Sequence, residues 1–192
     1  MPFFDPGILR LLGFVLLFLL VAPLFPFIHV VLTWRSDARG RVDGTGTFAA
    51  LLYFRTASAL LALAGAANLT YGWISTTPAT PELTRLSWGM LLGSIAFLLL
   101  NVVLIRARFP SHPAHARTAR AFTGFLMVMA GLVALTTLVL LSIALFRKAA
   151  SEKDIAQRAD ELKLYGAWAL YYVAAYVAST WWLSRGARGE AA

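Results

Sequence analysis

Residues 121–146 read AFTGFLMVMAGLVALTTLVLLSIALF, a stretch of 26 residues without a single charged side chain. A helix needs roughly 20 apolar residues to cross about 30 Å of hydrocarbon, so this stretch predicts a membrane-spanning helix. The whole chain agrees with that class, because 59% of its 192 residues are hydrophobic and only 14% are charged.

Four further segments meet the same length requirement. The predicted spans are residues 11–34, 48–74, 86–105, 121–146 and 164–183. The connections between them are too short to fold as soluble domains, so residues 1–192 form a single transmembrane domain. The predicted fold class is all-α, a bundle of five transmembrane helices in a polytopic integral membrane protein.

The first and last spans carry special features. Pro23 and Pro26 remove backbone donors and predict a kink in the first helix, with a re-entrant pair of half-helices as the alternative. Asp5 near the start and the length of the apolar run argue against a cleavable signal peptide. Ser151 begins an amphipathic segment that could continue as one helix into the last span.

Basic residues predict the orientation, because the cytoplasmic loops of a membrane protein are rich in Lys and Arg. With five spans, one face holds nine basic and three acidic residues, and the other holds seven basic and six acidic residues. The nine are Arg35, Arg39, Arg41, Arg106, Arg108, Arg117, Arg120, Arg185 and Arg188. We therefore expect a multi-pass protein of the cell (inner) membrane with its N-terminus outside and its C-terminus in the cytoplasm.

One loop concentrates four of these arginines, which are Arg106, Arg108, Arg117 and Arg120. Anionic lipid headgroups explain them better than nucleic acid, because they flank the spans and belong to no base-reading motif. Orientation by positive charge is one interpretation of this loop, and a specific anion- or lipid-binding site is the other.

Arg55 is the strongest functional pointer, because a charged side chain inside a span costs several kcal/mol unless it finds a partner or reaches the interface. On a helical wheel it shares a face with the small residues Ala59, Ala62 and Ala66, and small faces favour helix packing. No span contains an acid, which also argues against proton relays in the bilayer. The partner of Arg55 is a loop carboxylate, a carbonyl, a headgroup or an anionic ligand.

Histidine offers only weak metal or haem candidates. His29 lies near the cytoplasmic end of the first span, and His112 and His115 lie in the basic loop on the same side. Their spacing matches no ligand motif, so we predict no metal and leave any cofactor unidentified.

Polar and small residues within the spans indicate helix packing. Asn68 and Asn101 are expected to form interhelical hydrogen bonds, with a pore lining as the alternative. Gly89 and Gly93 form a GxxxG pair that favours close approach of another helix, within the protomer or between protomers.

Aromatic residues recur at helical spacing in the last span. Trp168, Tyr172 and Tyr176 share one face, and the two tyrosines lie too deep for an interfacial belt. We expect this face to contact another helix, another subunit, or a ring-shaped or isoprenoid ligand.

No sequence motif indicates catalysis. The chain has no cysteine and no P-loop, GxSxG or HExxH motif, so we expect that it is not an enzyme. The leading hypothesis is a non-catalytic membrane subunit that assembles with itself or with a larger complex through small-residue and aromatic helix faces. The alternatives are a small channel or transport module whose cytoplasmic mouth favours anions, and a protein that holds haem, quinone, pigment or lipid.

Overall fold

The computed structural model describes residues 24, 28–29, 31–32, 45–75, 80–109, 113–148 and 152–188, apart from the side chains of residues 45, 113–115, 153 and 186–188. Four long helices account for most of this part: α3 (Thr45–Ile74), α4 (Pro81–Arg108), α5 (Pro113–Phe146) and α6 (Glu152–Arg188). The fold is all-α, as predicted. Nearly all of the first predicted span, including the kink expected at Pro23 and Pro26, lies outside the described residues.

Three of these helices are long and apolar enough to cross a membrane: Gly46–Ile74, Pro81–Arg108 and Ala116–Phe146. The chain is accordingly a multi-pass membrane protein, and three of the five predicted spans coincide with these helices. The last predicted span lies within α6, which is less apolar because its first turns are charged and its later turns carry tyrosine and tryptophan. The amphipathic segment predicted before that span is part of the same continuous helix, although Ser151 itself is not described.

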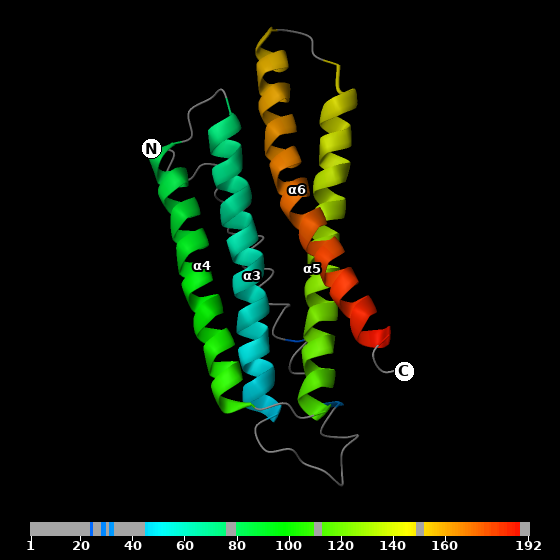
Figure 1. The fold of residues 1–192 in the computed structure, drawn as a ribbon. Coiled ribbons are helices and arrows are strands. Elements are labelled where there is room, and N and C mark those ends of the chain that lie inside the picture. Colours follow the sequence, from blue (N-terminus) through cyan, green and yellow to red (C-terminus); the bar gives the residue numbers. More distant parts are fainter. Residues whose placement is uncertain are drawn as a thin grey trace.

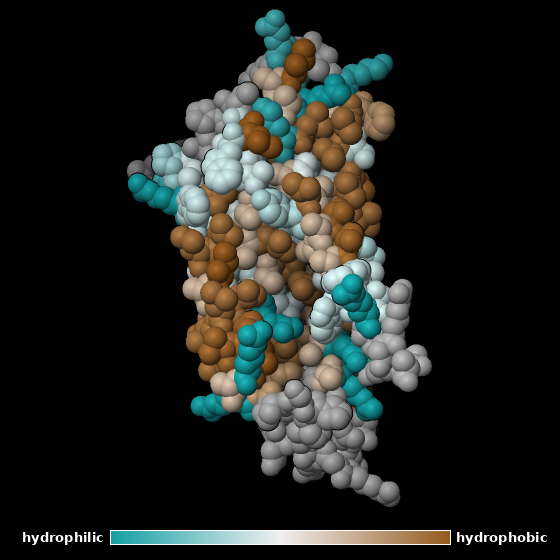
Figure 2. All heavy atoms as spheres, in the orientation of Figure 1, coloured by the Kyte–Doolittle hydropathy of each residue, from teal (hydrophilic) through white to brown (hydrophobic). Residues whose placement is uncertain are grey.

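The helices form two antiparallel hairpins, α3 with α4 and α5 with α6 (Figure 1). Among the described helices, α3 contacts the other three, whereas α4 contacts α3 alone. Hydrophobic side chains cover much of the visible sides of the bundle, and hydrophilic side chains gather toward its two ends (Figure 2). This distribution suits helices whose flanks meet lipid and whose ends meet water.

The α3–α4 hairpin depends on one glycine. A Cβ atom added at Gly65 would lie 2.8 Å from the backbone nitrogen of Leu91 and 2.9 Å from the carbonyl oxygen of Ser87. Only a residue without a side chain lets the two backbones come this close, which is the usual role of small residues between membrane helices. Apart from Ser87 and Asn101, no residue of α4 is buried by the described part of the chain.

Two buried clusters join α3 to the second hairpin. The first contains Phe48, Ala49, Leu52 and Tyr53 from the start of α3 and Phe122 from α5. The second contains Leu60 from α3, Ala130 and Ala134 from α5, and Tyr172 from α6. Both clusters include α3, and α3 contacts each of the other three described helices, so the described bundle is organised around it.

Polar groups cap the helices at the end of the bundle where α3 ends and α4 begins. Thr80 caps α4 by accepting a hydrogen bond from the backbone N–H of Leu83, and Pro81 occupies the first turn, where its missing donor costs nothing. Arg158 donates hydrogen bonds to the carbonyl oxygens of Ala144 and Leu145, which satisfies the C-terminal end of α5. Its contact with α5 ties the charged first turns of α6 to the neighbouring helix.

Candidate functional site

The alternation of helix direction sorts the charged residues between the two ends of the bundle. The start of α3, the end of α4, the start of α5 and the end of α6 share one end (Figure 1). The described basic side chains at this end are Arg106, Arg108, Arg117, Arg120 and Arg185, and no described acid accompanies them. We call it the basic end. The described acids lie at the other end, mixed with basic residues: Glu82, Glu152, Asp154, Asp160 and Glu161.

Arg55 lies on α3, between the basic end and the middle of the bundle. Its side chain is partly buried. Among the described residues, no side chain or carbonyl group lies within hydrogen-bonding or ion-pair distance of its guanidinium. Other arginines differ in this respect: Arg147 pairs with Glu161 at 3.3 Å, and Arg185 stacks over the ring of Trp181. Arg55 is therefore a cation within a candidate span whose charge is not neutralised by any described group.

The small-residue face predicted beside Arg55 borders a groove. Ala59, Ala62 and Ala66 of α3 form one wall, and Tyr171, Ala175 and Ala178 of α6 form the other. The groove has a volume of about 360 Å³ and an almost entirely apolar lining. It lies where α6 leans away from α3 as it crosses α5 (Figure 1). The alanine face thus turns toward α6, but the two helices leave space between them.

On the other side of this groove, α3 and α6 are joined by side-chain hydrogen bonds. The indole Nε1 of Trp168 donates to Asn68 Oδ1 at 3.0 Å, and the hydroxyls of Tyr171 and Thr70 lie 2.9 Å apart. Nearer the basic end of α3, the hydroxyl of Tyr172 donates to the Leu60 carbonyl oxygen at 3.0 Å. Polar groups in an apolar medium gain from such pairing, so these bonds fix the register of the two helices.

The predicted aromatic face of α6 therefore lies inside the chain. The rings of Trp168 and Tyr172 stack with centroids 5.6 Å apart, and Tyr172 is only 2% exposed. Tyr176 lies against α5, where a Cβ atom added at Gly131 would be 3.0 Å from its ring. All three aromatic residues thus contact other helices of the protomer, although Tyr176 remains 41% exposed.

The other predicted packing residues occupy different environments. Asn101 is buried, but its amide donates to the Phe97 carbonyl of its own helix at 2.7 Å. Gly89 and Gly93 are exposed on α4, and no atom lies within 4 Å of a Cβ atom built at either position. Asn68 thus bonds between helices, Asn101 bonds within one helix, and the GxxxG pair faces outward.

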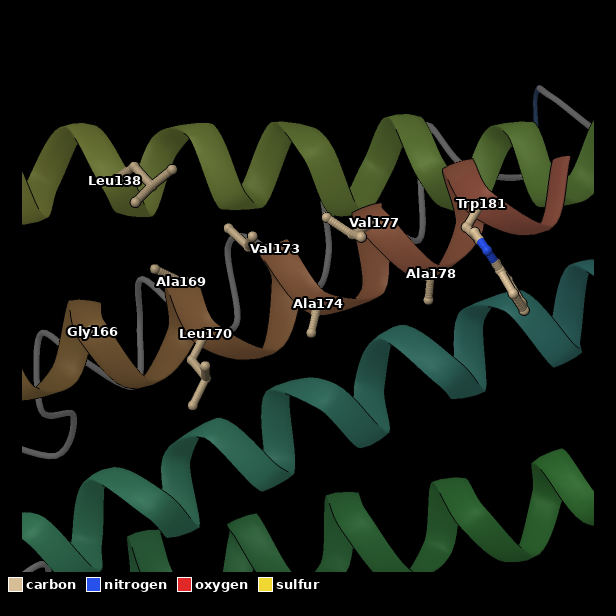
Figure 3. Close-up of a pocket in the computed structure, with 9 residues that line it drawn as sticks. All are labelled: Leu138, Gly166, Ala169, Leu170, Val173, Ala174, Val177, Ala178 and Trp181. Carbon is tan, nitrogen blue, oxygen red and sulfur yellow. The ribbon is translucent and has the colours of Figure 1, made fainter. Parts of the chain in front are cut away.

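The outer face of α6 carries a shallow apolar groove of about 780 Å³ (Figure 3). Its residues lie opposite Trp168 and Tyr172 on the helix, with Leu138 of α5 added at one side. The α6 residues are Gly166, Ala169, Leu170, Val173, Ala174, Val177, Ala178 and Trp181. The lining combines glycine and alanine with larger apolar side chains.

Of the three histidines, the structure describes the side chain of His29 only. Its Nε2 lies 3.4 Å from the Thr118 hydroxyl, and its ring meets Phe122 edge-on at 6.2 Å. His29 is thus in contact with the start of α5 near the basic end. His112 and the side chain of His115 lie outside the described part, within which no group of three or more His, Cys, Asp or Glu residues could hold a metal ion.

Gly65 and Gly131 were not singled out in the sequence, although both determine how closely helices approach. The available signal for Gly65 is its position within the small-residue run Ala64 to Ala67, which favours helix packing but does not say which residue touches a neighbouring backbone.

No protein-family model, curated protein or solved structure matches this chain.

Proposed function

We propose that this protein is a non-catalytic membrane subunit that assembles, with itself or with a larger complex, through the outward face of α4. One observation carries the proposal: Gly89 and Gly93 lie on an exposed apolar helix face with open space at both Cβ positions. A GxxxG pair allows a second helix to approach closely, and van der Waals contact between backbones then stabilises the pair in lipid.

The rest of α4 supports this role. Ala96 continues the small stripe one turn beyond Gly93, and the exposed side chains of Leu92 and Leu100 flank it. The opposite face, with Ser87 and Asn101, is the one that packs on α3. The stripe is thus separate from the contacts that hold the protomer together.

The proposed topology has five spans, formed by residues 11–34 and by α3 to α6, with the basic end in the cytoplasm. Cytoplasmic loops are rich in Lys and Arg, which favours the basic end as the cytoplasmic one, and the described acids lie at the opposite end. Basic side chains at this end would also face anionic headgroups, each contributing about 1 kcal/mol near an acidic leaflet.

The experiment that tests assembly replaces Gly89 and Gly93 together with isoleucine. Because both Cβ positions are open, the protomer should fold normally, while the new side chains should keep a second helix from approaching. Size and composition of the detergent-solubilised particle would be measured by light scattering and by mass spectrometry of proteins that co-purify from native membranes. We expect the variant to run as a smaller particle with fewer partners.

A matched control is Gly124→Ile on α5, where an added Cβ atom also meets open space. This variant should keep the particle size of the unmodified protein. Particles of unchanged size and composition in the Gly89→Ile and Gly93→Ile double variant would show that α4 is simply a lipid-facing helix.

A further inference from the structure

We propose that the groove between α3 and α6 binds one acyl chain of an anionic phospholipid whose phosphate contacts Arg55. This inference does not depend on assembly through α4, because the groove and the Gly89–Gly93 stripe occupy different faces. It rests on the groove, on the position of Arg55 along α3, and on the charge of Arg55.

The groove has the chemistry of an acyl-chain site. Its volume of about 360 Å³ falls within the range of small-molecule pockets, and its lining is alanine and leucine with one aromatic ring and one serine, Ser179. The ring belongs to Tyr171, which is held in place by its 2.9 Å contact with Thr70. The ring forms the boundary beside Ala66, so a chain bound here would enter from the Ala59 side.

Arg55 occupies the right position on α3 for a headgroup. It precedes Ala59 by four residues, which places it on the same helix face and about 6 Å nearer the basic end. Helix side chains lean toward the N-terminus of their helix, and α3 begins at the basic end. The guanidinium therefore reaches toward the membrane surface, while the alanines run from it into the apolar interior.

Charge selects an anionic lipid over a zwitterionic one. No described group neutralises Arg55, and the described side chains at the basic end include no acid. Arginine donates paired hydrogen bonds to phosphate oxygens, and such bonds strengthen where water is scarce. A phosphate at this position would supply the missing partner and leave its acyl chain beside Ala59 and Ala62.

Native mass spectrometry of the purified protein tests this inference. Bound dioleoyl phosphatidylglycerol and dioleoyl phosphatidylcholine would be counted at equal concentrations, for the unmodified chain and for Arg55→Gln. We expect the phosphatidylglycerol preference to fall about tenfold in Arg55→Gln, which corresponds to about 1.4 kcal/mol, because the charge-assisted hydrogen bond to the phosphate is lost. Arg85→Gln, which removes an exposed arginine at the opposite end of the bundle, should change the preference by less than about twofold.

A second variant tests the groove independently of charge. Ala62→Leu should fill the groove and weaken retention of both lipids, whereas Ala50→Leu, at an exposed position of α3 outside the groove, should leave retention unchanged. Glycerol phosphate without acyl chains should compete poorly with phosphatidylglycerol. The inference is overturned if Arg55→Gln and Arg85→Gln behave alike, if Ala62→Leu binds lipid normally, or if glycerol phosphate competes as well as the lipid.

Discussion

The closest backbone approach in the described bundle predicts a strong effect of a single methyl group at Gly65. In Gly65→Ala, the new Cβ atom would lie 2.8 Å from the Leu91 nitrogen, against an ordinary contact of 3.4 Å or more. The two helices must therefore separate locally by about 0.6 Å, because a backbone atom cannot rotate away. Overpacking of this kind costs about 1 to 3 kcal/mol, which raises the equilibrium constant for unfolding about 5- to 150-fold.

The measurement is the free energy of unfolding during titration with a denaturing detergent, followed by circular dichroism. Gly124→Ala is the matched control, because it makes the same change in helix propensity with open space around the new methyl group. The difference between the two variants isolates the clash. Equal stability of Gly65→Ala and Gly124→Ala would refute the close packing of α3 on α4.

Two further predictions concern the α3–α6 contact and the orientation. A double-mutant cycle of Trp168→Phe and Asn68→Leu should give a coupling energy of about 0.6 to 1.7 kcal/mol, and a coupling of zero would contradict the hydrogen bond as a stabilising contact. The chain has no cysteine, so in intact cells a membrane-impermeant maleimide should label Lys148→Cys and spare Ala107→Cys, both exposed at opposite ends. The reverse pattern would invert the proposed topology.

Helix positions were predictable because their cause is local. A long apolar stretch without charge has to form its backbone hydrogen bonds within a helix. Residues 86–105 and 121–146 accordingly lie within α4 and α5. The helices extend beyond the predicted spans, since α5 starts at Pro113 and α4 ends at Arg108. Their end turns are polar and have no hydrophobic signature.

The contacts between particular residues within the bundle were much less predictable. Gly89 and Gly93 carry the recognisable packing motif and face outward, whereas Gly65, without a motif, lies at the backbone contact. The two asparagines are chemically identical, yet Asn68 bonds to another helix and Asn101 to its own. Which neighbour a side chain meets depends on helix rotation and crossing, which no short pattern specifies.

The sequence by itself determined that this is an all-α, multi-pass membrane protein with an arginine in an otherwise uncharged span. Hydrophobicity and charge act residue by residue, so composition along the chain is enough for that. Only the tertiary structure decided that the aromatic face of α6 turns inward and that Arg55 stands in line with an apolar groove. Those features depend on how α6 crosses α5 and diverges from α3, a result of packing over the whole bundle.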